Sequence, residues 1–144
     1  MPENLAESLL TFARAMRARQ ASLLATHGLH PGQDALLMLV WQRPGLRQTD
    51  LAGQLGVEPP TVTRMVRRLE RGGLVERRRD QDDGRTLRIH PTPRSRLLEA
   101  MVRRTWSDLD GELLAALGPV DAERFRRLAD SAARALSAAP DPER

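Results

Sequence analysis

Residues 59–71 place an apolar stripe and an arginine face on a single predicted helix. Read at 3.6 residues per turn, the apolar residues line one side, which predicts a helix that packs by that side. They are Val62, Met65, Val66 and Leu69. The arginines repeat at the same spacing on the opposite side. They are Arg64, Arg67, Arg68 and Arg71. Guanidinium groups suit phosphate oxygens and guanine edges, so this helix can pack on one side and meet a polyanion on the other.

The segments around this helix predict a helix-turn-helix followed by a β-hairpin. Upstream, residues 31–42 and 48–55 favour two shorter helices, and residues 56–58 favour a turn. Downstream, Gly72-Gly73 predicts the helix end. Residues 74–78 and 86–90 are short, β-compatible runs joined by a seven-residue loop, which is the pattern of a hairpin or wing.

Residues 4–24, 93–117 and 121–137 predict three further helices. In the first, Leu5, Leu9, Phe12 and Met16 are spaced 4, 3 and 4 residues apart. That narrow seam is typical of helices that pair side by side, although an ordinary intramolecular core has the same appearance. The predicted fold is therefore mainly α with a small β-wing.

The charge of the chain is concentrated in its middle. All 23 basic residues are arginine, and the formal net charge at pH 7 is +4. Residues 1–63 are neutral, residues 64–104 carry a net +7, and residues 105–144 carry a net −3. Such asymmetry favours a polyanionic partner over a merely solvated arginine surface.

Several other classes of function find little support in the sequence. The chain has no cysteine, which removes disulfides and thiolate chemistry, and no apolar run long enough to cross a membrane. We therefore expect a cytoplasmic protein without a membrane segment. His27 and His30 are better interpreted as loop residues than as metal ligands, and the acids of residues 80–83 lack the spacing of a calcium loop. We predict no metal, no cofactor and no enzymatic activity.

The chain resembles the MarR family of bacterial transcriptional regulators over nearly its whole length. The most specific segments are residues 48–57, residues 61–70, residues 73–77 and the wing motif Asp83-Gly84-Arg85. The chain departs from the family pattern at Pro91 and Ser95, where leucine and glycine are usual, and at Arg47, which cannot act as a Ser/Thr-type N-cap. Because proline donates no ladder bond, we expect the second wing strand to end by His90.

The resemblance implies one domain over residues 1–144, with a winged helix-turn-helix lobe at 31–92 and dimerisation helices at 4–30 and 93–137. It implies a homodimer that binds double-stranded DNA at a pseudo-palindromic operator. We expect Thr61, Thr63, Arg64 and Arg68 to lie at base edges or adjacent phosphates. We expect Arg67 and Arg71 to bind phosphates, although any of these arginines could instead pair with Glu58 or Glu70. Arg77, Arg78 and Arg79 flank the wing, where only some can face the duplex, and we expect Arg79 to contact DNA. The resemblance implies that Arg85 reaches the minor groove or its backbone, with Asp83 orienting Arg85.

The resemblance also implies a repressor released by a small aromatic or acidic ligand. We expect that ligand to lie among Arg14, Arg17, Trp41 and Trp106. Two alternatives stay open. One is a constitutive or architectural DNA-binding regulator without ligand sensing, and the other is a winged-helix adaptor that binds proteins.

Overall fold

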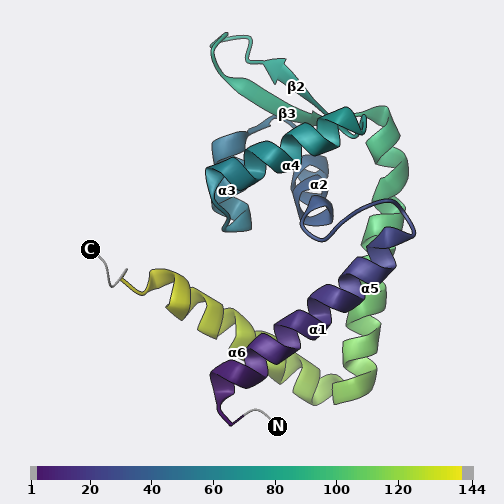
Figure 1. The fold of residues 1–144 in the computed structure, drawn as a ribbon, viewed down its shortest axis with the longest axis vertical. Coiled ribbons are helices and arrows are strands. Elements are labelled where there is room, and N and C mark those ends of the chain that lie inside the picture. The colour runs from purple at the N-terminus through teal and green to yellow at the C-terminus, as the bar shows by residue number, and fades with distance from the viewer. Residues whose placement is uncertain (1–2, 141–144) are drawn as a thin grey trace. The chain divides into compact units, whose positions relative to one another are not determined.

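A computed structural model describes residues 3–140 of the chain (Figure 1). Its elements are α1 (Leu5–Ala25), α2 (Gln33–Gln42), β1 (Leu46–Arg47), α3 (Gln48–Leu55), α4 (Pro59–Arg71), β2 (Val75–Arg79), β3 (Leu87–Pro91), α5 (Pro93–Leu117) and α6 (Pro119–Ala138). The fold is mainly helical with a small wing, as the sequence predicts. The chain divides into two compact units at residue 105, inside α5.

The sheet of the first unit contains one strand that the sequence did not reveal. Its order is β1-β3-β2, and both pairings are antiparallel. β2 and β3 form the predicted hairpin, each one residue later than expected. β1 is only two residues long, too short to produce a periodic pattern.

The core of the first unit contains three of the four residues of the apolar stripe predicted for α4, and the fourth, Met65, is half-buried against it. Buried side chains from α2, α4 and the sheet come together, each 2% exposed or less. They are Leu36, Leu37, Val40, Val62, Val66, Leu69, Val75 and Ile89. Burying one such side chain contributes about 1.5–3 kcal/mol. The apolar stripe of α4 therefore fixes the opposite side of that helix toward solvent.

The junction between the wing and α5 corrects one prediction. β3 continues to Pro91, which lies opposite Val75, rather than ending at His90. The next residue, Thr92, donates its backbone N–H to the carbonyl of Leu74 at 3.2 Å. In an antiparallel ladder the residues alternate between bonded and non-bonded positions, so the N–H that Pro91 lacks would point away from β2. Proline therefore costs this ladder no bond.

Ser95 also has a defined role at that junction. It is fully buried, and its hydroxyl accepts a hydrogen bond from Trp41 Nε1 at 3.2 Å. Thr92 caps the first turn of α5 by accepting from the Ser95 backbone N–H at 3.2 Å. The serine thus supplies the partner that a buried indole N–H requires.

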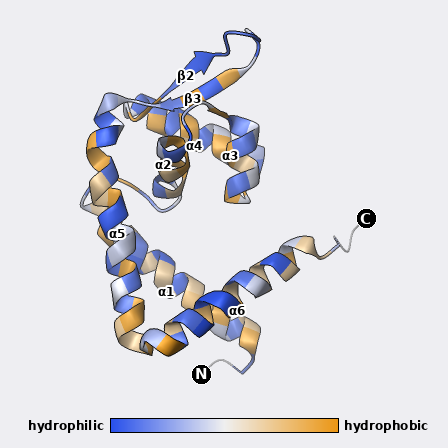
Figure 2. Cartoon of the chain, turned by 180° about the vertical axis from the view of Figure 1, so that it is seen from behind, coloured by the Kyte–Doolittle hydropathy of each residue, from blue (hydrophilic) through white to orange (hydrophobic). Residues whose placement is uncertain are grey.

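The terminal helices leave apolar side chains in solvent. Leu5 on α1 is 74% exposed. In the second unit, α6 buries none of its residues, and Val120, Leu128 and Leu136 are all more than 60% exposed. Apolar and polar residues alternate along α6 (Figure 2). In the seam predicted at the start of the chain, Leu5 and Leu9 are exposed, whereas Phe12 and Met16 are half-buried.

Candidate nucleic-acid interface

α4 begins and ends at residues that specify its limits. Pro59 and Pro60 occupy the first turn, where a missing N–H leaves no bond unmade. Gly73 follows the helix with φ +72°, a left-handed conformation that glycine adopts without strain. The Leu74 N–H donates to the carbonyl of Leu69 at 2.9 Å and closes the last turn. The helix therefore presents its arginine face along its full length.

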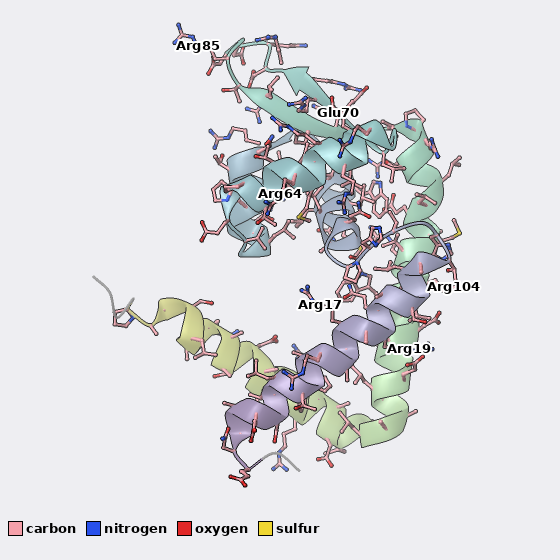
Figure 3. All side chains as sticks on the ribbon, in the orientation of Figure 1. Arg17, Arg19, Arg64, Glu70, Arg85 and Arg104 are labelled. Atoms are coloured by element: carbon pink, nitrogen blue, oxygen red, sulfur yellow. The ribbon has the colours of Figure 1, made fainter. Side chains whose placement is uncertain are left out.

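The arginines of α4 are free of carboxylate partners among the described residues. Arg67, Arg68 and Arg71 are exposed and have no ion pair or hydrogen-bond partner within residues 3–140. Arg64, labelled in Figure 3, makes one long contact of 3.5 Å to the Thr61 hydroxyl. Four guanidinium groups are thus available to a ligand.

The acid that could have neutralised this face points elsewhere. Glu70 accepts from Arg77 Nε at 2.8 Å, which joins α4 to β2. Arg77 lies opposite Ile89 in the sheet, so it shares the inner face that packs toward the helices. The alternative in which Glu70 pairs with an arginine of α4 is therefore not what the structure shows.

The two predicted threonines have different surroundings. Thr61 lies beside Arg64 and its hydroxyl accepts from that guanidinium. Thr63 donates to the carbonyl of Pro59 at 3.1 Å and lies 3.4 Å from Gln48 Oε1 of α3. A hydroxyl has one proton, so Thr63 is engaged in the packing of α3 against α4. Thr61 is the better candidate for a base contact.

Arg47 starts α3 in the way its chemistry permits. Its backbone N–H donates to Asp50 at 3.2 Å, and its Nε donates to the same carboxylate at 3.1 Å. The guanidinium hydrogen bond, followed by the backbone N–H, holds the pKa of Asp50 below its usual value. As expected, Arg47 does not accept a bond from the helix; Asp50 supplies the cap instead.

The wing loop is ordered by its own side chains, which refines the expectation for Asp83. The Asp83 carboxylate accepts from the Arg85 backbone N–H at 3.0 Å and from the Thr86 hydroxyl at 2.8 Å. Those two bonds, the backbone one first, lower the pKa of Asp83. Asp83 therefore orients the backbone of Arg85, whereas the Arg85 side chain extends from the tip of the hairpin without a partner among the described residues (Figure 3).

Two further arginines support the same loop. Arg79 donates to the carbonyl of Gly84 at 2.6 Å, so part of this predicted DNA contact holds the wing together. Arg88 donates to Asp80 at 2.6 Å and to the carbonyl of Gly45 at 2.9 Å. Sequence reasoning missed Arg88 because its partner at Gly45 depends on β1, which the pattern did not predict.

A small cavity lies against the first half of α4. Its volume is about 180 Å³. Residues from the segment before α2, from α2 and from α4 line it; they are His30, Pro31, Gln33, Thr61, Arg64, Met65 and Arg68. It therefore combines an apolar wall with two of the unpaired guanidinium groups.

The predicted ligand residues do not gather at that cavity. Trp41 is 4% exposed in the core of the first unit, bonded to Ser95. A residue so enclosed packs the lobe and offers no surface to a ligand, so its assignment is corrected. Arg14 and Arg17 are exposed on α1, where Arg14 donates to Thr11 at 3.2 Å. Trp106 belongs to the second unit and is 37% exposed.

Among residues 3–140, none of the helices is both long and apolar enough to cross a membrane. In the same range, no three histidine or acidic side chains come together in a way that could hold a metal ion.

Comparison with known proteins identifies the winged lobe. The MarR family model matches residues 29–87, the span from the start of the lobe to the second wing strand. The chain superposes with a TM-score of 0.86 on the transcriptional repressor CouR bound to a 23-mer DNA duplex, at 25% identity, covering 91% of this chain and 93% of that one. Residues 29–87 thus belong to the MarR family. The prediction that the protein is not an enzyme agrees with that match.

Two proteins similar to this chain are regulators by name. The HTH-type transcriptional regulator TtmR of Methylorubrum extorquens (strain PA1) is 36% identical over 88 residues, which are 61% of this chain and 43% of TtmR. A putative transcriptional regulatory protein for the hcr operon of Thauera aromatica is 30% identical over 110 residues, 76% of this chain and 65% of that protein. The chain thus spans less than two thirds of either relative.

A second solved structure shows the same fold with a small molecule. CouR from Rhodococcus jostii RHA1 bound to p-coumaroyl-CoA superposes with a TM-score of 0.79 at 22% identity, covering 91% of this chain and 92% of that one.

Proposed function

We propose that this protein is a homodimeric transcriptional regulator that binds double-stranded DNA at a pseudo-palindromic operator. The observation that carries the proposal is the solvent face of α4, where Arg64, Arg67, Arg68 and Arg71 have no carboxylate partner among the described residues. Unpaired guanidinium groups on a helix that can enter the major groove are suited to both phosphates and guanine edges. Because its proposed partner is DNA, we also place the protein in the cytoplasm.

The contacts divide by their place on the lobe. Thr61 and Arg64 lie in the N-terminal half of α4, the part of a recognition helix that reaches base edges, and Arg68 follows one turn after Arg64 on the same side. Arg67 and Arg71 are assigned to phosphates, which position a protein without specifying a sequence. Arg85 at the tip of the wing is assigned to the minor groove, where a narrow A·T-rich tract concentrates negative potential.

Dimerisation is supported by the apolar residues that the terminal helices expose. Leu5 on α1 and Leu136 on α6 are each more than 70% exposed. A second copy of the chain would remove such residues from water, at about 25 cal/mol for each Å² buried. Helices 4–30 and 93–137 are thus proposed as the dimerisation region.

Repression that a small aromatic acid relieves is the proposed mode of regulation. The cavity beside α4 is supported as its site because Arg64 and Arg68 line it together with Met65. A carboxylate there would pair with two of the guanidinium groups assigned to the operator. Ligand and DNA would then compete for the same charges.

The central experiment titrates the purified protein against duplexes from its own upstream region and measures the mass of the complex. Two protomers on one palindrome support the proposal, and one protomer per site contradicts the dimer. Release by aromatic carboxylates such as benzoate or cinnamate supports regulation by a ligand. Operator binding that no such acid alters favours the constitutive regulator, and a lobe that binds no duplex at any salt concentration favours the protein adaptor.

A further inference from the structure

Three arginines form a row across the outer face of the sheet. Arg47 of β1 lies opposite Arg88 of β3, and Arg88 lies opposite Arg78 of β2. Directly opposed residues point to the same face, and neighbouring strands lie about 4.8 Å apart. Ile89 and Val75 occupy the inner face, so the row looks away from the core. Like charges placed directly opposite one another destabilise a sheet, and this arrangement therefore needs compensation.

Each arginine of the row has its own acid. Arg47 pairs with Asp50, Arg78 pairs with Glu76, and Arg88 pairs with Asp80. The pairs at the two ends are local: Arg47 contacts an acid three residues away, and Arg78 contacts one two residues away. These end pairs neutralise charge without joining distant parts of the chain.

Arg88 differs because it joins three segments. Its Nε donates to Asp80 at the start of the wing loop at 2.6 Å, and its Nη1 donates to the carbonyl of Gly45 at 2.9 Å. Asp80 also accepts the backbone N–H of Asp82 at 2.9 Å inside that loop. One guanidinium on β3 therefore ties the loop of residues 80–86 to the turn that leads into β1 and α3.

The turn is shaped to receive this side chain. Gly45 has φ +92°, and a Cβ added there would lie 3.4 Å from the His90 ring and 3.9 Å from Cδ of Arg88. The backbone of the turn thus lies directly over the outer face of β3. A larger residue at position 45 would be strained by this positive φ, although its Cβ would only touch the Arg88 stem and the ring at ordinary contact distance.

We propose that Arg88 is a positioning residue for DNA binding: it fixes the wing loop, and with it Arg85, relative to the turn that opens the helix-turn-helix. The inference rests on the proposed function and assigns Arg88 no contact with DNA. The distance between the wing tip and the recognition helix must match the distance between a minor groove and the adjacent major groove. The hydrogen bonds from Arg88 to Asp80 and to Gly45, here called the Arg88 strut, join the two segments. They keep that spacing fixed before binding.

The test is a double-mutant cycle measured on the operator duplex. Arg88→Gln removes the strut, and Arg85→Ala removes the side chain that the strut is proposed to place. We expect Arg88→Gln to weaken operator binding by roughly three- to tenfold, the range for disordering one charge-assisted contact. In the Arg85→Ala background the same substitution should change binding by less than about twofold, because nothing remains to be positioned.

Arg78→Gln is the matched control. It removes one positive charge from the same face of the neighbouring strand, where Arg78 contacts Glu76 and not the wing loop. We expect it to leave the affinity within about twofold of the wild type, since its pair is a local surface pair. Arg88→Lys keeps the charge but lacks the planar fork that reaches Asp80 and Gly45 together, so its affinity should fall between those of the wild type and Arg88→Gln.

The outcomes separate the two proposals. A wild-type protein that binds no duplex overturns the proposed function itself. Operator binding by the wild type with equal losses in Arg88→Gln and Arg78→Gln overturns the strut, because charge alone would explain both. Losses from Arg88→Gln and Arg85→Ala that simply add also overturn it. Melting curves of each variant, recorded without DNA, confirm that the compared proteins are folded at the binding temperature.

Discussion

The arginines of α4 and those of the sheet are chemically identical, but only those of the sheet are paired with carboxylates. On α4, Arg67, Arg68 and Arg71 have no partner among the described residues. On the outer face of the sheet, Arg78 and Arg88 are each bound to a carboxylate. The difference teaches that arginine content alone does not locate a nucleic-acid surface. The distribution of acids decides which guanidinium groups are free to donate to a phosphate or a base edge.

The two states also have different energetic consequences. Ion pairs near the surface add little to stability because water and salt screen them, so the sheet pairs matter chiefly for geometry. An unpaired arginine in solvent adds very little to the stability of the folded chain. It does add to the free energy of binding when it contacts a polyanion, because counterions are then released from that polyanion. We therefore expect mutations on α4 to change DNA binding directly, and mutations of the sheet pairs to act through the geometry of the wing.

The largest effect is expected from α4. Arg64→Ala or Arg68→Ala should change the base preference and cost about 1–3 kcal/mol at each half-site, because a bidentate contact to a base edge is lost. Arg71→Ala should weaken all sequences alike, since a phosphate carries no sequence information. Selection from random duplexes measures both. Identical selected motifs for the wild type, Arg64→Ala and Arg68→Ala would reject the assignment of base contacts.

The next effect concerns the wing, the one part of the sheet region that extends a free guanidinium. Arg85→Ala should weaken operator binding and flatten its salt dependence. Each neutralised phosphate contributes about −0.9 to the slope of log K against log salt, so the loss from two wings is up to roughly two units. Binding isotherms at four or more salt concentrations give the slope. A lowered melting temperature with an unchanged slope would instead mean that Arg85 only supports the hairpin.

Asp83→Ala should reproduce this loss in part. It removes the acceptor of the Arg85 backbone N–H and of the Thr86 hydroxyl, but leaves the Arg85 guanidinium present. The affinity should therefore fall less than in Arg85→Ala, and the slope should stay closer to that of the wild type. Asp82→Ala is a suitable control, since its acid lies in the same loop. A loss in Asp83→Ala as large as that in Arg85→Ala would show that loop order, not charge, dominates the wing contact.

Much of the fold was predictable because residues close together in the sequence determine it. The 3.6-residue period of Val62, Val66 and Leu69 fixed both faces of α4, and all three are buried as predicted. Prolines and glycines marked the ends of α4 and α5 within a residue or two. The partners of long-range pairs were not predictable in this way. Nothing in the local pattern indicates that Trp41 donates to Ser95, 54 residues away.

The candidate site shows the same division. Its arginine face followed from spacing alone, whereas the neutralisation of Arg77, Arg78 and Arg88 depends on strand register and on the short β1. Pro91 shows that a general sequence rule can also give a wrong prediction when the strand register is not known. A general rule against proline in a ladder predicted an early strand end, but the register placed Pro91 where no ladder bond is required. Register is a tertiary property, and one sequence does not reveal it.

The smallest effect is expected from the paired carboxylates and is measured as the fall of the melting temperature at low pH. The pKa values of Asp50 and Asp80 lie below the usual 3.8, for Asp50 chiefly because of the Arg47 guanidinium, and for Asp80 because of the Asp82 backbone N–H and then Arg88. A carboxylate with a lowered folded-state pKa stabilises the fold above its unfolded pKa and loses that contribution as the pH falls through the folded value. The melting temperature of the wild type should therefore fall more steeply below about pH 4 than that of an Asp50→Asn, Asp80→Asn double variant. Arg67→Gln on α4 should leave the steepness unchanged, since Arg67 has no carboxylate partner among the described residues. Melting curves from pH 7 to 2.5 compare the three proteins. Equal steepness in the wild type and the double variant would mean that the sheet pairs add nothing to stability, and the contrast between the two arginine sets would then be one of geometry alone.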